Sequence, residues 1–152
     1  MEAWQRLRAA GSARVFFAAV RRAVTEEDEW RTIASYGADA FAPSGSGSAW
    51  VSDPTGLRAA YLADNDDAIR GRALAMVGEC RAVVKAGESV AAVVRDGLGG
   101  AYADVLLMHY VDCLSFAQVA EMCGCSKSAA MLRRDVACDW VDSQPLSAFK
   151  GG

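Results

Sequence analysis

Cationic and small polar residues near the carboxyl end of this 152-residue chain form its clearest chemical pattern. The tip Ser126-Lys127-Ser128 opens a helical pattern, and Arg133-Arg134 follow about two turns later. Such side chains at the start of a helix suit contacts with the bases and phosphates of duplex DNA. Adjacent helical residues point about 100° apart, so one arginine can pair with an acid such as Asp139 while the other meets phosphate. The pattern predicts a DNA-binding site, and we expect Lys127→Glu with Arg134→Glu to abolish retention on DNA while leaving the fold intact.

Other reactive residues argue against catalysis and against metal binding. His109 is the only histidine, so no histidine pair exists, and we expect it to have a surface or interface role. Four of the five cysteines could be drawn as zinc ligands, but Cys123-Gly124-Cys125 is not the two-residue knuckle that structural zinc sites favour. An odd cysteine count with no secretory signal also disfavours a disulfide framework. We predict a cytoplasmic protein that is not an enzyme, with buried thiols and with neither metal nor other cofactor.

Composition indicates an all-α protein that does not enter a membrane. The chain is 53% apolar with three prolines, alanine is abundant, and no run approaches the length of a membrane span. The net charge of −3 weighs against DNA binding, because affinity comes mostly from neutralising phosphates. Residues 1–25, however, carry five arginines and a single acidic residue. We therefore expect weak DNA binding by a monomer and useful affinity only from an oligomer, most simply a dimer, or from a partner complex.

The elements that must position the tip read as a helix-turn-helix. Ser115 can cap a short helix, and Ala120 is small enough to lie where two helices touch. Gly124 tolerates the positive φ that the turn needs, and Ser126 can cap the second helix. Two helices joined by a glycine turn also occur in ordinary bundles, so a purely structural hairpin is the alternative.

Upstream of this motif the chain divides at glycines, serines and prolines. We expect a first helix over 3–24, interrupted near Gly11-Ser12, and a second over 26–36 with Thr25 as its cap. A long helix should run from Asp53 to an end at Gly87, and shorter helices should follow over 89–96 and over 101–111. Residues 37–52 read as a linker and residues 97–100 as a hinge. The predicted architecture is a helical bundle with a long central helix. Its domains are an N-terminal arm and linker (1–52), an oligomerisation helix with hinge (53–100) and a DNA-binding domain (101–152).

The run DVLLMHYVDCLSFAQVAEMCGCSKSAAMLRRDVACDWVD resembles the C-terminal DNA-reading domain of bacterial sigma factors. It is more similar still to small prophage transcription regulators of the RinA/ArpU type, which share that fold. The residues that carry the resemblance are Leu107, Tyr110, Leu114-Ser115, Val119-Ala120, Gly124 to Ser126, Ala137 and Trp140.

The resemblance implies a DNA-binding regulator of phage or prophage late genes that is sequence-specific, all-helical and oligomeric. Carried over by position, the residues approaching DNA would be Ser126, Lys127, Ser128 and Met131 along the second helix, with Ser115 and Gln118 near the backbone. One alternative is a protein-interaction module that docks on RNA polymerase or on a phage protein, as the acidic composition suggests. Another is a DNA-packaging adaptor of the small-terminase kind, which would form a large ring.

Overall fold

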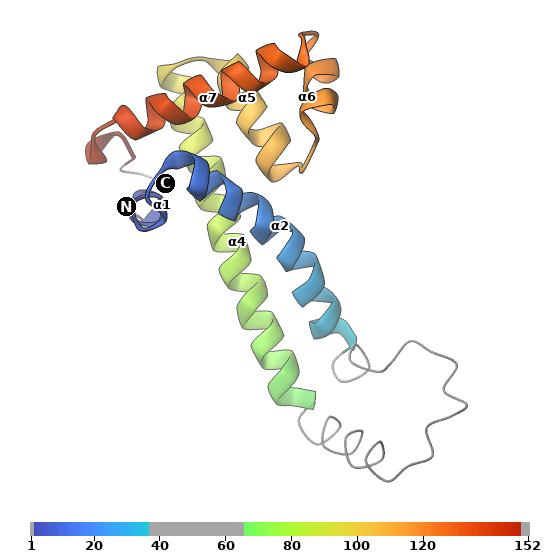
Figure 1. Ribbon diagram of the computed structural model, residues 1–152. Coiled ribbons are helices and arrows are strands. Elements are labelled where there is room, and N and C mark those ends of the chain that lie inside the picture. The colour runs from blue at the N-terminus through green and yellow to red at the C-terminus, as the bar shows by residue number, and fades with distance from the viewer. Residues whose placement is uncertain (1, 37–65, 150–152) are drawn as a thin grey trace. The chain divides into compact units, whose positions relative to one another are not determined.

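A computed structural model describes residues 2–36 and 66–149, and every regular element in these two ranges is helical. The elements are α1 (Glu2–Ala10), α2 (Ala13–Tyr36), α4 (Asp66–Gly97), α5 (Gly100–Leu106), the π-helical turn η2 (Leu107–Val111), α6 (Phe116–Cys123), α7 (Lys127–Ser143) and the 3-10 turn η3 (Leu146–Phe149) (Figure 1). The predicted all-α fold, with a long helix and a helix-turn-helix at its carboxyl end, is confirmed.

The predicted break near Gly11 is present, whereas the predicted break at Thr25 is wrong. Gly11 has φ 89° between α1 and α2, a conformation that favours glycine. Thr25 instead lies inside a continuous α2. A threonine caps a helix only where the backbone leaves helical geometry, and the acidic residues that follow can all remain helical. Glu27 and Arg31, one turn apart, form an ion pair along this continuous stretch.

Gly87 lies within α4, so the prediction that it ends the helix is also wrong. The reason for a glycine here is close packing. A Cβ at this position would lie 2.8 Å from Cγ2 of Val20 on α2. The expected helix start at Asp53 and the linker over 37–52 fall outside the described residues. At its carboxyl end α4 stops at Gly97, and α5 begins at Gly100, so the helices are interrupted within the predicted hinge over residues 97–100.

Two compact units divide the described residues. Residues 2–25 and 80–149 belong to the first, and residues 26–36 and 66–79 to the second. The main core of the first unit is built from α1, α2, α4, α5 and α7, and its largest fully buried side chains include Phe16, Phe17, Val90, Val94 and Leu106. A smaller cluster of Val105, Val119, Ala120 and Ala130 joins α5, α6 and α7. Phe16 and Phe17 thus bury one side of α2, which carries three of the N-terminal arginines, in this core.

Candidate nucleic-acid interface

The first helix of the motif is held at its N-terminus by a complete capping box. The Ser115 hydroxyl accepts a hydrogen bond from the backbone N–H of Gln118 at 3.2 Å, and the Gln118 side-chain carbonyl accepts from the Ser115 N–H at 2.9 Å. Both side chains remain exposed. The hydroxyl proton of Ser115 and the amide NH₂ of Gln118 are thus left as donors for a neighbouring phosphate.

The turn between α6 and α7 has the geometry that its sequence predicts. Gly124 adopts the left-handed conformation with φ 62°, and the Cys125 N–H donates to the Ala120 carbonyl at 3.0 Å. Ala120 is 5% exposed where α6 meets α7. The two helices therefore meet through a small residue. Figure 1 shows α6 next to the start of α7.

The second helix presents the predicted tip to solvent. The Ser126 hydroxyl accepts from the Ala129 N–H at 3.1 Å, which caps α7. Ser126, Lys127 and Ser128 are all exposed, and Met131 is 38% exposed one turn further on. The backbone N–H groups and the dipole at a helix N-terminus add positive potential to the charge of Lys127. This end of α7 is thus suited to an anionic surface.

Arg133 and Arg134 diverge, as neighbours on a helix must. The Arg134 side chain is 21% exposed, and its Nε donates to Asp135 at 2.6 Å. Its guanidinium also lies 5.0 Å from the centre of the Phe116 ring, and its interaction with Tyr110 favours the charged form and so contributes to raising the pKa of Arg134. Arg134 thereby ties α7 to α6 and to the bracing helix, the name used here for α5 and η2, which precede the motif. Arg133 is partly buried and has no ion pair among the described residues, so it is the member of the pair whose charge is available to an anion.

These contacts change how the site should be probed. Arg134→Glu would place a carboxylate beside Asp135 and remove the cation from Phe116, so the fold would be disturbed together with any DNA contact. The expectation that Lys127→Glu with Arg134→Glu leaves the fold intact is therefore not supported by the packing. Arg133→Glu is the cleaner partner for Lys127→Glu.

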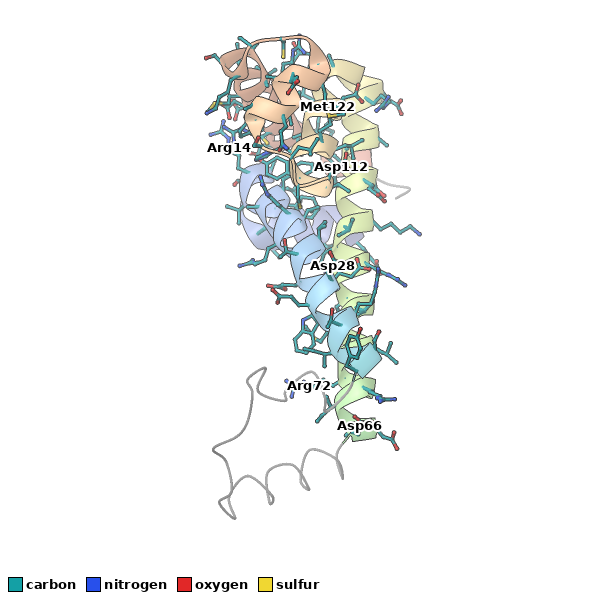
Figure 2. All side chains as sticks on the ribbon, turned by 90° about the vertical axis from the view of Figure 1, so that its right-hand side faces the viewer. Arg14, Asp28, Asp66, Arg72, Asp112 and Met122 are labelled. Carbon is teal, nitrogen blue, oxygen red and sulfur yellow. The ribbon has the colours of Figure 1, made fainter. Side chains whose placement is uncertain are left out.

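Acidic residues on α7 hold the N-terminus of α2, a role that sequence reasoning missed. Arg14, labelled in Figure 2, donates to Asp139 at 3.0 Å and lies 3.7 Å from Asp135. The Asp142 carboxylate accepts from the Ala13 N–H at 2.8 Å, at the positive end of the α2 dipole. These acids are four and three residues apart on one face of α7. That spacing was the sequence signal that could have revealed where the N-terminus of α2 packs on α7. Their pairing offsets the repulsion that Asp135 would exert on a DNA backbone.

His109 connects the bracing helix to the motif from within the π-helical turn. Its Nδ1 lies 2.7 Å from the Leu114 carbonyl oxygen, which can only accept, so Nδ1 carries the proton. Nε2 then accepts from the Arg21 guanidinium at 3.0 Å, and the imidazole stacks on Phe116 at 3.9 Å. The pKa of His109 is lowered, first by burial and also by the charge of Arg21, although the hydrogen bond to Leu114 opposes the shift. The expected interface role takes the form of a neutral, intramolecular link.

None of the five cysteines is part of a disulfide. Cys80 and Cys138 are buried, and burial raises the pKa of Cys138 to about 12. Cys123 and Cys125 are partly buried and pack against the smaller core cluster, and Cys113 is also partly buried, so the predicted burial of the thiols is complete only at Cys80 and Cys138. Over residues 2–36 and 66–149, no group of three histidine, cysteine, aspartate or glutamate side chains is placed to hold a metal ion.

Comparison with known families assigns the motif. The family model for sigma-70 region 4 matches residues 97–133, from the end of α4 through the first two turns of α7. The chain thus carries a sigma-like helix-turn-helix domain, which indicates a DNA-binding regulatory function. No curated protein and no solved structure matches the chain. In the described part of the chain, no helix combines the length and apolarity needed to cross a membrane.

Proposed function

We propose that the protein is a cytoplasmic, sequence-specific transcription regulator of phage or prophage late genes that binds double-stranded DNA as an oligomer. The observation that supports the proposal best is the exposed, serine-capped tip at Lys127 and Ser128, inside the part of the chain that matches sigma-70 region 4. In this mechanism the start of α7 enters the major groove, while Ser115 and Gln118 approach the backbone. Residues 101–152 are the proposed DNA-binding domain, without catalysis or cofactor.

Oligomerisation is proposed to use residues 53–100, the range that the sequence analysis assigned to it, which includes α4. Among its described residues, Leu74 is 62% exposed, an apolar surface that a second copy of the chain could cover. Paired helix-turn-helix domains read half-sites about 34 Å apart, one turn of duplex. A dimer with its two tips at that spacing is the arrangement that we favour.

The central test substitutes Lys127→Glu together with Arg133→Glu and measures binding to a pool of short random duplexes over a range of salt. The slope of log K against log salt is negative, and each lost phosphate contact makes it shallower by about 0.9. The slope of the double variant should therefore be shallower by roughly twice that amount, and the variant should lose most of its affinity. A matched control is Arg6→Glu with Arg72→Glu, which changes the charge equally at exposed positions outside the sigma-like match, on α1 and on the side of α4 away from Leu74. Should the first variant bind like its parent, or the control lose as much, the proposed mechanism fails.

The acidic composition supports a second candidate, a module that docks on RNA polymerase or on a phage protein without gripping DNA. This candidate would be favoured if neither the parent nor the Lys127→Glu, Arg133→Glu variant shifts any duplex while both co-elute with RNA polymerase. Mass photometry of the same samples counts subunits. Eight or more subunits would instead indicate a packaging ring of the small-terminase kind.

A further inference from the structure

Three apolar side chains emerge from α7 directly behind the exposed tip. Leu132 is 63% exposed, and Met131 and Val136 are 38% and 37% exposed. Four residues advance a helix by little more than one turn, so Ser128, Leu132 and Val136 form one row along α7. The row begins at the polar tip and continues it with apolar surface.

This row has no part in the core of the protein. The buried side chains of α7 are Ala130, Ala137, Cys138 and Val141. At 100° per residue, Leu132 lies about 140° around the helix from Ala137 and about 180° from Val141. Leu132 therefore points away from the body. A leucine exposed in this way adds nothing to packing among the described residues. Its location, in the second turn of the candidate recognition helix, therefore suggests contact with a ligand.

The position of Leu132 specifies the kind of ligand. It is within the match to sigma-70 region 4 and follows Lys127 and Ser128, the residues proposed to enter the major groove. The side chains at the start of a recognition helix are those that contact base edges. Among the natural bases, the apolar feature that the major groove offers is the 5-methyl group of thymine.

Charge around the row permits this approach. Asp135 and Asp139 are the acids nearest to Leu132 in the sequence of α7, and both are engaged by arginines. Arg14 contacts both carboxylates from α2, and Arg134 contacts Asp135. A phosphate backbone passing alongside the row would meet ion pairs rather than two free carboxylates.

We propose that Leu132, beside Ser128, contacts the 5-methyl group of thymine in the major groove, so that the protein selects sites with thymine at a defined position. The inference rests on the proposed function, because it needs α7 to enter duplex DNA. It goes further by naming a specificity-determining residue and the base that this residue recognises.

The test uses duplexes selected by the parent protein from a random pool, each then synthesised with thymine or with deoxyuridine at one position at a time. Deoxyuridine lacks only the methyl group, so charge and base pairing are unchanged. Burial of one methyl group is worth about 0.8 kcal/mol, or roughly a fourfold change in affinity. We expect such a loss at one or two positions for the parent and no loss for Leu132→Ala.

The matched control is Val15→Ala, a change at a similarly exposed aliphatic side chain on α2 (54% exposed), which should keep the parental thymine preference. Circular dichroism confirms that both variants fold. The inference is overturned if the selected duplexes contain no preferred thymine, if deoxyuridine costs nothing, or if Leu132→Ala keeps the parental preference. In each of these outcomes the proposed function is still supported if Lys127→Glu weakens DNA binding.

A parent protein that retains no duplex at low salt overturns both claims. Loss of polymerase co-elution in Leu132→Ala would then show that the row binds protein instead.

Discussion

Gly97→Ala should destabilise the protein, although alanine is the better helix former. In an open helical position the exchange gains about 0.5–1 kcal/mol. At Gly97, the last residue of α4, a Cβ would lie 2.4 Å from Cζ2 and 2.5 Å from Cη2 of Trp140. Ordinary contacts begin near 3.4 Å, so the rigid indole, which packs against the main core, must move by about 1 Å. Overpacking of this kind costs about 1–3 kcal/mol, and we expect a net loss of about 1–2 kcal/mol.

Urea unfolding followed by circular dichroism measures this loss. Gly100→Ala is the matched control three residues away, because its Cβ would meet only the Arg95 guanidinium at 3.9 Å, and it should cost nothing. Trp140→Leu removes the obstructing ring, so Gly97→Ala should lose its penalty in that background. A Gly97→Ala protein as stable as the parent, or a penalty that persists with Trp140→Leu, would refute the reasoning.

Two further predictions concern the motif. Because the pKa of His109 is lowered, its contribution to the free energy of unfolding is complete above pH 6.5 and declines as the pH falls below that value. Urea midpoints followed from pH 7 towards about pH 5 should fall more steeply for the parent than for His109→Gln, and parallel profiles would contradict the lowered pKa of His109. Gly124→Ala should cost about 1–2 kcal/mol from its positive φ alone, since nothing lies within 4 Å of the added Cβ, and Gly124→Asn should cost less. Equal urea midpoints for the parent and Gly124→Ala would show that the turn relaxes.

Signals confined to a few residues were enough to predict the motif. A serine before an apolar pattern, a small residue at the helix contact and a glycine in the turn each constrain their own backbone, and Ser115, Ala120, Gly124 and Ser126 behave as expected. The error at Gly87 arose because the outcome there depends on a distant partner. Gly87 permits close approach to Val20 instead of stopping a helix, and no local pattern distinguishes these two uses of glycine.

Arg134 shows the same limitation in the candidate site. Its sequence position next to Arg133 gives no indication of which side chain points inward. That choice follows from the placement of Tyr110 and Phe116, which come from the π-helical turn and from α6. The π-helical turn itself has no clear sequence signature, yet it sets the direction of both His109 and Tyr110. Side-chain roles here depend on packing between elements, which spacing along one helix cannot reveal.

The net charge of the chain is a poor guide to the surface that DNA would meet. On α7 every aspartate has a partner, either an arginine or the N-terminus of α2. Lys127 and Arg133 have no ion pair among the described residues, and both lie in the first two turns of that helix. Pairing thus removes negative charge from the face of α7 and leaves its cations at the end proposed to enter the groove. An acidic composition is therefore compatible with a locally cationic recognition helix, and the salt dependence of binding should report those two side chains and not the sum over the chain.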